Sequence, residues 1–153
     1  MSPGRRKQPK TGANIPSGQR IEKGADPNFY RTQTPLWDFG SRDRDHPRWG
    51  WSRLDANQFF DLVYAKLSSF QTMTWAEILT ASGGRSSGTN SHEVPVANLT
   101  REARSRLDTL GILTDTLFSL RLQGTHRVYG VREARTLRVI WFDEDHEIYP
   151  TGR

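Results

Sequence analysis

The chain has 153 residues, no cysteine, a formal net charge of +5 and a sequence isoelectric point of about 10.0. Its length fits one domain, and the lack of cysteine excludes a disulfide framework, a thiolate metal site and a cysteine nucleophile. No apolar run approaches the roughly 20 residues that a membrane-spanning helix needs, and the basic N-terminus has no apolar signal region, so we expect a cytoplasmic protein without a membrane partner.

Residues 1–24 are predicted to form a disordered basic arm. Only 34% of the chain is hydrophobic and the mean hydropathy is -0.74, so part of the chain is expected to be uncompacted. The arm holds six of the 22 Lys and Arg but only one of the 17 Asp and Glu, which leaves 16 of each sign in residues 25–153. This predicted single domain is therefore electroneutral. The arm could bind phosphates non-specifically or aid solubility.

The segment 25–54 is predicted to be irregular chain pinned by packed aromatic rings, because it combines Pro and Gly with many large rings. The alternative is a platform on which nucleic-acid bases stack. The rings belong to Phe29, Tyr30, Trp37, Phe39, Trp49 and Trp51. His46 lies in the charged run SRDRDHPR and is predicted to take no part in a site.

Helices are expected over about residues 55–110. Asp55 and Gln58 form a capping box that begins the first helix, which runs to about Ser69. A second capping box, Thr74 with Glu77, begins a short helix. The buried stripe of the first helix is predicted to hold Phe59, Val63, Leu67 and Phe70.

A glycine- and serine-rich stretch, residues 83–92, is predicted to be a flexible loop. Asn98 or Thr100 then caps a third helix, and Gly111 is a natural residue to end it. The inward face of this helix is predicted to hold Ala103, Leu107 and Leu110.

After Gly111 the apolar period changes from 3.6 to 2, which predicts a β-meander over about residues 117–149. Strands are expected at residues 117–122, 126–131, 137–142 and 146–149. In the first strand, Phe118, Leu120 and Leu122 should face one way, with Ser119 and Arg121 facing the other. In the third, Leu137, Val139 and Trp141 should share a face. The predicted fold is α+β, with N-terminal helices packed on a small C-terminal antiparallel β-sheet.

Arginines gather on this meander. Five Arg and one Glu lie between Arg121 and Arg138, and residues 143–147, DEDHE, then add four acids. Arg guanidinium groups with His and Tyr side chains could support phosphodiester chemistry without a metal, because Arg stabilises the charged phosphorus centre and His or Tyr moves protons. The alternative is that these Arg simply pair with acids across neighbouring strands.

His146 is the best histidine candidate because it follows Asp143, whose region offers carboxylates that could fix the imidazole tautomer. His92 could instead be a surface or capping residue, and His126 a turn residue. Asp143, Asp145 and His146 with one of these histidines could in principle hold a divalent ion, but no metal-binding spacing is present. We therefore predict no metal and no cofactor.

The succession of helices, Leu-Arg-Leu, Arg-Val-Tyr, a hydrophobic strand and a terminal His/Tyr element resembles the RelE/ParE toxin superfamily over about residues 98–149. The short motifs MTWAEI, SH, LFSLRL, RVYGVR and WFDEDH also resemble a family of uncharacterised bacterial proteins, from Leu36 to Tyr149. This second resemblance supplies no activity.

The toxin resemblance implies metal-independent RNA cleavage, usually of messenger RNA on the ribosome, in which a ribose 2′-hydroxyl attacks the neighbouring phosphate. It also implies an antitoxin protein as a partner, and it maps the functional roles to Arg121, Arg127, Arg132, His146 and Tyr149. The superfamily also contains gyrase inhibitors, so the fold alone does not settle the chemistry.

From the resemblance and the individual residues together we predict two groups. The catalytic group is His146, Arg127, Tyr149 and Tyr129, and the substrate-binding group is Arg121, Arg132, His92 and His126. The alternative function is a non-catalytic protein- or nucleic-acid-binding module. In this module the sheet and the Trp-containing segment 25–54 bind the partner, and the basic arm adds affinity.

Overall fold

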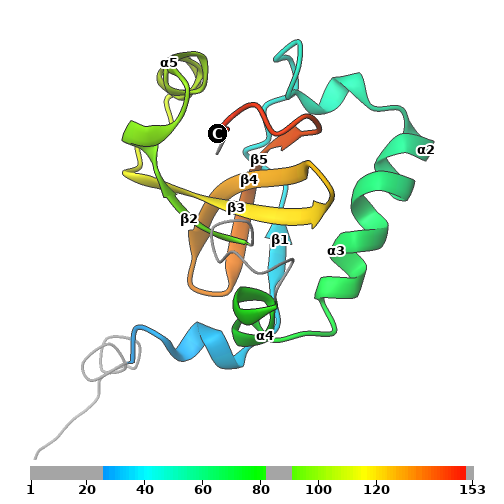
Figure 1. Ribbon diagram of the computed structural model, residues 1–153, viewed down its shortest axis with the longest axis vertical. Coiled ribbons are helices and arrows are strands. Elements are labelled where there is room, and N and C mark those ends of the chain that lie inside the picture. Colours follow the sequence, from blue (N-terminus) through cyan, green and yellow to red (C-terminus); the bar gives the residue numbers. More distant parts are fainter. Residues whose placement is uncertain (1–25, 82–90, 151–153) are drawn as a thin grey trace, which may run out of the picture.

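The computed structural model describes residues 26–81 and 91–150 of the chain (Figure 1). The predicted basic arm, residues 1–24, lies outside the described residues. Of the predicted loop, residues 83–92, only the last two residues are described. The described chain combines helices with one β-sheet, so the fold is α+β.

The centre of the sheet is the predicted meander. It consists of β3 (Thr116–Gln123), β4 (His126–Glu133) and β5 (Thr136–Asp143), joined as two antiparallel hairpins. Two further strands extend it: β2 (His92–Pro95) is antiparallel to β3, and β1 (Leu36–Asp38) is parallel to β5. The order is β1-β5-β4-β3-β2, so the sheet is mixed and not wholly antiparallel. The added strands are too short to show a period-2 pattern in sequence.

The predicted fourth strand of the meander, residues 146–149, does not form. A turn at residues 144–145 is instead followed by bends at residues 146, 148 and 149. The carboxylate of Asp143 accepts hydrogen bonds from the backbone N–H groups of Glu147 at 2.9 Å and Ile148 at 2.7 Å. Because backbone donors must be satisfied, a side chain that takes two of them leaves fewer for a strand ladder, and the chain curls back.

The first predicted helix forms as one helical run of three parts. They are α2 (Ala56–Gln58), the π-helical segment η4 (Phe59–Tyr64) and α3 (Ala65–Phe70). Asp55 accepts a hydrogen bond from the backbone N–H of Gln58 at 2.8 Å, and the side chain of Gln58 accepts one in return, so the predicted capping box is confirmed. The π-helical middle was not indicated by the sequence pattern.

The other two predicted helices also form. The helix α4 (Trp75–Thr80) begins at the predicted capping box, in which the Thr74 hydroxyl accepts from the third backbone N–H that follows. The helix α5 (Arg101–Leu110) is capped by Thr100 and ends at Gly111, whose φ of 73° is the left-handed conformation that glycine adopts without strain. Short 3-10 helices occur at η2 (Phe29–Thr32), η3 (Trp51–Arg53) and η6 (Val96–Asn98).

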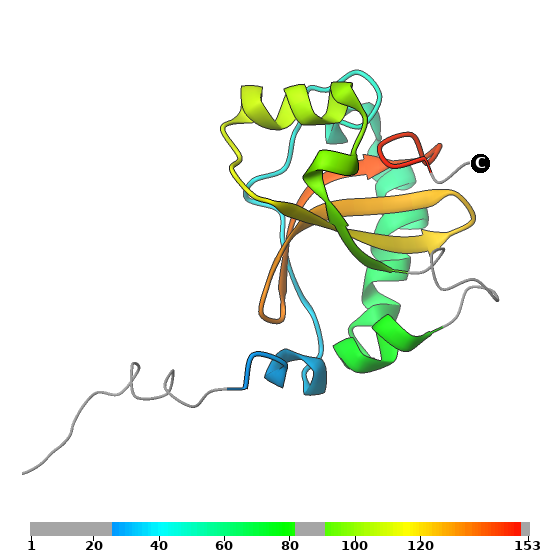
Figure 2. The same cartoon turned by 60° about the vertical axis from the view of Figure 1, so that its left-hand side comes forward.

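The sheet is buried on both faces, between the helical run on one side and α5 on the other (Figures 1 and 2). The first core includes Trp51, Val63, Leu67, Trp75, Ile78, Phe118, Leu120, Leu122, Val128, Leu137, Val139 and Phe142. The second core includes Trp49, Val94, Leu99, Ala103, Leu107, Leu117, Tyr129, Ile140, Trp141 and Ile148. The predicted shared face of Phe118, Leu120 and Leu122 is confirmed. Of the six aromatic rings in residues 25–54, all but Phe29 lie in or against these cores.

A β-bulge in β5 changes which residues face each core. Tyr129 pairs with Trp141, whereas the next residue, Gly130, pairs with Val139, so Ile140 is an extra residue on its strand. A bulge shifts the alternation of side chains by one position. Trp141 therefore lies in the second core, and its predicted place on the same face as Val139 is wrong.

A buried carboxylate joins three parts of the fold. Asp43, which belongs to the segment 25–54, is 2% exposed and contacts α5 and β5. Its two oxygens accept hydrogen bonds from Nε and one Nη of Arg106 and from the indole N–H of Trp141, each at 2.8 Å. Burial by itself raises the pKa of Asp43, but these donors outweigh it and lower the pKa to about 2.

His46 is a structural residue of the same region, although its charged surroundings in sequence gave no such indication. Its ring is buried and stacks on that of Trp49 at a centroid distance of 4.2 Å. Nδ1 accepts the backbone N–H groups of Arg48 and Trp49, both at 3.1 Å, so the proton lies on Nε2. Nε2 is 3.0 Å from a carboxylate oxygen of Glu102 and donates to it.

Replacing Asp43 with Asn should lower the free energy of unfolding by about 2 kcal/mol at pH 7, because the depressed pKa of the carboxyl measures how strongly the fold favours its charged form. In the wild type this contribution should be lost as the pH falls from about 4 towards 2, and Asp43→Asn should lack that part of the acid sensitivity. Urea unfolding at several pH values measures both. Asp108→Asn, an exposed position on α5, is the control and should change little.

Candidate functional site

Strand register gathers polar side chains on the second-core face of the sheet. Arg121 of β3 lies directly opposite Arg127 of β4. Two residues further along, Ser119 lies opposite both Tyr129 of β4 and His92 of β2. Because alternate residues of a strand point to the same side, these side chains share the face that carries Trp141.

The chain after β5 returns over this face, on the side of the sheet where α5 also lies (Figure 2). Asp143 holds the return through the two backbone hydrogen bonds described above, and Ile148 anchors it in the second core. Between them His146 has a φ of 60°, a value that is uncommon for a residue with a side chain. Arg48 adds ion pairs to Glu147 of this return and to Glu102 of α5.

Arg127 differs from the other charged residues of the site in being buried, with 6% of its surface exposed. Its Nη1 donates to the backbone carbonyls of Gly124 at 2.7 Å and His126 at 3.2 Å. Within residues 26–81 and 91–150, the ion pairs within 4.0 Å involve neither Arg127 nor Arg121. Burial, followed by the charge of Arg121, lowers the pKa of Arg127.

Two cations placed opposite each other on a sheet repel, and a buried charge is normally paired. Asp143, which lies across from Arg127 on β5, directs its oxygens to the backbone N–H groups instead. A bound anion would relieve both the repulsion between Arg121 and Arg127 and the cost of burying the latter. The arrangement is therefore suited to a phosphate group.

His146 lies within the influence of these charges. Burial, then Arg127, Arg121 and His92, lowers its pKa below the usual 6.5. The imidazole is therefore neutral at pH 7 and can accept a proton. We predicted that a nearby carboxylate would fix the imidazole tautomer of His146. Asp143 instead orients the backbone around His146 and not its ring.

His92 approaches the same region from β2. Its Nδ1 is 3.0 Å from the carbonyl oxygen of Glu93, and because a carbonyl only accepts, Nδ1 carries the proton. This leaves Nε2 as the nitrogen that can exchange a proton. The ring of His92 also meets the edge of the Tyr149 ring at a centroid distance of 6.2 Å.

Tyr129 shares this face but is fully buried. Its hydroxyl makes no hydrogen bond at bonding distance within the part of the chain that is described, although Ser119 lies opposite. Burial raises the pKa of Tyr129 far above its usual value. A phenol in this position cannot touch a bound substrate, so the geometry does not support the catalytic role predicted for Tyr129.

Two predicted substrate-binding residues point to the opposite face. His126 packs edge-on against Phe142 of the first core at 5.5 Å, and the guanidinium of Arg132 lies 3.9 Å from the centre of the Tyr30 ring. Both are an odd number of residues from Arg127 on the same strand, so the alternation of β4 separates them from it. The structure thus brings together Arg121, Arg127, His146, Tyr149 and His92, with Tyr129 beneath them.

Sequence reasoning missed two serines beside this group. Ser119 is buried, and its position two residues before Arg121 on a strand was the available signal. The Ser91 hydroxyl accepts the backbone N–H of Arg121 at 2.9 Å. Ser91 precedes β2, a strand that the sequence did not predict, so nothing indicated this contact.

Within the described ranges, no cluster of three or more His, Asp or Glu side chains has the geometry to hold a metal ion. None of the helices in those ranges is long and apolar enough to cross a membrane. Comparison with protein-family models, with curated proteins and with solved structures gives no significant match. What distinguishes this α+β protein is therefore the geometry of two arginines and one histidine on one sheet face, with a second histidine on the chain that returns after β5.

Removing the positive charge of Arg121 should raise the pKa of His146, because this cation disfavours the protonated imidazole. NMR titration of the imidazole carbon-bound protons in wild type and Arg121→Ala measures the shift. Arg42→Ala removes an exposed arginine from another part of the surface and should leave the titration unchanged. An unchanged His146 titration in Arg121→Ala would show that the two side chains are not close in solution.

Proposed function

We propose that the protein is a metal-independent endoribonuclease that cleaves RNA in the cytoplasm through attack of a ribose 2′-hydroxyl on the adjacent phosphate. The observation that carries the proposal is the buried Arg127 opposite Arg121, which makes no ion pair within 4.0 Å among the described residues, near a histidine whose pKa is lowered. Such a group offers an anion site and a neutral base together. The resemblance to RelE/ParE toxins adds messenger RNA on the ribosome as the proposed substrate and an antitoxin protein as the proposed partner.

In this mechanism Arg121, which is partly exposed, binds a non-bridging oxygen of the scissile phosphate, and the buried guanidinium of Arg127 adds positive charge behind it. The guanidinium of Arg127 is held in place by the carbonyls of Gly124 and His126, so little reorientation is needed when charge develops on the phosphorus centre. Neutral His146 accepts the proton of the 2′-hydroxyl while the 2′-oxygen forms its bond to phosphorus.

The bond from phosphorus to the 5′-oxygen then breaks, and the leaving oxygen must receive a proton. His92 is the proposed donor, because a proton on its Nε2 is compatible with the hydrogen bond from Nδ1 to the Glu93 carbonyl. Tyr149, whose ring packs edge-on with that of His92, is proposed to orient His92 or the substrate. The products are a 2′,3′-cyclic phosphate and a free 5′-hydroxyl.

The second candidate is a non-catalytic nucleic-acid-binding module. The burial of Tyr129 favours it, since one predicted proton donor is inaccessible. Both candidates use Arg121 and Arg127 for phosphate, and they differ in what His146 does. Only catalysis requires the 2′-hydroxyl of the substrate and the imidazole of His146.

His146→Ala should lower kcat/KM for RNA cleavage by about 100-fold or more, the usual contribution of a general acid or base. Arg121→Ala should cause a loss of similar order, because a charge that stabilises the transition state is removed. The assay follows a labelled single-stranded RNA in the presence of EDTA, with an oligonucleotide of the same base sequence in which every 2′-hydroxyl is replaced by hydrogen as the uncleavable substrate.

Arg42→Ala is the matched control for the arginine variant, and circular dichroism verifies that each variant is folded. Intact RNA after incubation with high concentrations of the wild type would contradict the nuclease proposal. If that RNA nevertheless bound, and bound equally well to His146→Ala, the binding module would be the better description.

The pH dependence of kcat/KM provides an independent test. The base must be unprotonated, so activity is lost as the pH falls through its pKa, and the lowered pKa of His146 should keep the enzyme active below pH 6.5. Arg121→Ala should move this acidic limb to higher pH. An acidic limb that is identical in the two proteins would assign the base to another group.

A further inference from the structure

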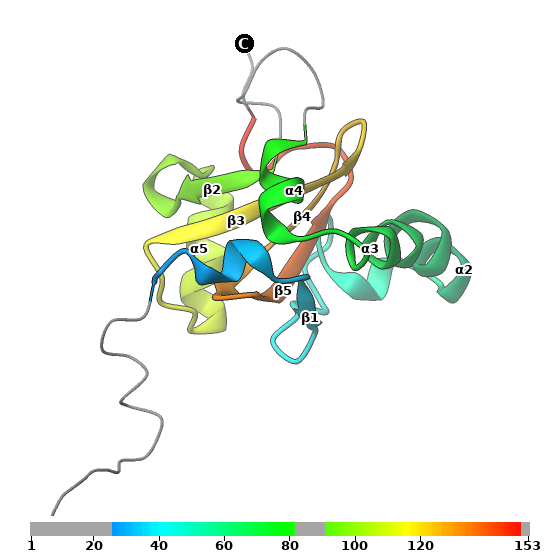
Figure 3. The same ribbon diagram turned by 90° about the horizontal axis from the view of Figure 1, so that it is seen from below.

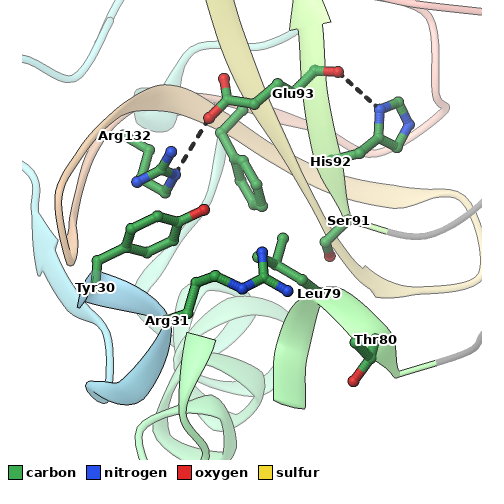
Figure 4. Close-up of a pocket in the computed structure, with 9 residues that line it drawn as sticks. Tyr30, Arg31, Leu79, Thr80, Ser91, His92, Glu93 and Arg132 are labelled. Carbon is green, nitrogen blue, oxygen red and sulfur yellow. Dashed lines mark hydrogen bonds and ion pairs between the residues drawn. The ribbon is translucent and has the colours of Figure 1, made fainter. Parts of the chain in front are cut away.

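A pocket of about 560 Å³ lies on the other side of the sheet, between η2, α4 and the edge strand β2 (Figures 3 and 4). Figure 4 shows Tyr30 and Arg31 extending into it from η2, with Glu93 and Ser91 facing them. Its volume is within the range of small-molecule and cofactor sites. Of the residues that line it, the mechanism above uses His92 alone.

The pocket combines cations with an aromatic surface. The guanidinium of Arg132 lies 3.9 Å from the centre of the Tyr30 ring, and its Nε donates to Glu93 at 3.2 Å. Arg31 also lines the pocket, and the ion pairs found within the described ranges do not involve it. The two Arg outnumber the one carboxylate, so the pocket carries net positive charge beside stacked planar groups.

This combination is typical of sites for single-stranded nucleic acid. Planar bases stack on aromatic rings and on guanidinium planes, and free guanidinium groups bind phosphate. Glu93 adds an acceptor for the N–H groups of a base. Arg31 makes no ion pair among the described residues, so an anionic ligand suits the pocket better than an aliphatic or uncharged one.

Strand β2 contributes residues both to the pocket and to the proposed catalytic face. Successive residues of a strand point to opposite faces, and both Glu93 and His92 line the pocket; Figure 4 shows Glu93 directed toward Arg132 and the ring of His92 directed away from Tyr30 and Arg31. His92 in turn lies beside Tyr149 and contributes to the lowered pKa of His146. A chain that crosses the edge of the sheet at β2 would reach both sites.

We infer that this pocket is a nucleotide subsite of the proposed ribonuclease, which binds a nucleotide of the RNA chain next to the scissile bond. Arg31 binds its phosphate, and its base stacks beside Tyr30 and Arg132. The inference rests on the proposed function for the identity of the chain. It assigns the recognition of neighbouring nucleotides to the face of the sheet opposite the chemistry.

The test is equilibrium binding of a fluorescent, fully 2′-O-methylated RNA of about ten nucleotides, a length that spans a typical single-strand site and cannot be cleaved. Arg31→Ala should weaken binding by about tenfold, the effect expected for one charged contact. The slope of log affinity against log salt should fall by roughly 0.7, as for one phosphate on a single strand. Arg31→Lys should restore most of the slope, and Arg42→Ala, with the same change of charge, should alter neither quantity.

Equal binding by Arg31→Ala and Arg42→Ala would overturn the subsite. Displacement of the RNA by polyglutamate as readily as by unlabelled RNA would also overturn it, in favour of an acidic peptide ligand. The two proposals fail separately. If the wild type binds RNA through Arg31 but leaves natural RNA intact, only the nuclease proposal is contradicted. If natural RNA is cleaved but Arg31→Ala and Arg42→Ala bind RNA equally well, only the subsite is contradicted.

Discussion

The carboxylate of Asp43 is the contact on which the arrangement of this protein depends. It accepts from Arg106 of α5 and from Trp141 of β5 while belonging to neither element, so it fixes an irregular segment, a helix and the sheet relative to one another. Breaking a buried charge pair by removing one partner leaves the other charge without compensation, which is costly. His46, stacked on Trp49 and bonded to Glu102, strengthens the same junction. With α5 held by this junction, the polar residues of the second-core face lie beneath the chain that returns after β5.

The second-core face carries the candidate site because strand register places two positively charged side chains opposite each other. Arg121 and Arg127 oppose each other, and the nearby carboxylate of Asp143 is engaged by the backbone. The cost of this arrangement in the free protein is electrostatic repulsion and desolvation, and an anionic ligand would relieve both. The same two charges disfavour protonation of His146, so one feature accounts for both the proposed phosphate binding and the proposed base.

Short strands and one bulge account for most of the differences between expectation and structure. The bulge at Ile140 moves Trp141 into the second core, and Asp143 takes the backbone donors that a fourth meander strand would need. The edge strand β2 begins at His92, which brings a second histidine to the site and Glu93 to the opposite pocket. A segment of four residues has too few positions for its period to be recognised, so its pairing is decided by the partner strand.

The amino-acid sequence by itself determined the local elements. These elements depend on interactions between residues a few positions apart, so they could be predicted without knowledge of the tertiary structure. They are the capping boxes at Asp55 and Thr74, the helix end at Gly111 and the alternation in LFSLRL. The alternation of side chains along β4 also places His126 and Arg132 on the face of the sheet opposite Arg127. Only the tertiary structure decided the burial of Tyr129, the structural role of His46 and the meeting of His92 with His146 and the two arginines. Burial and long-range charge depend on residues far apart in sequence, whose approach is set by packing and register.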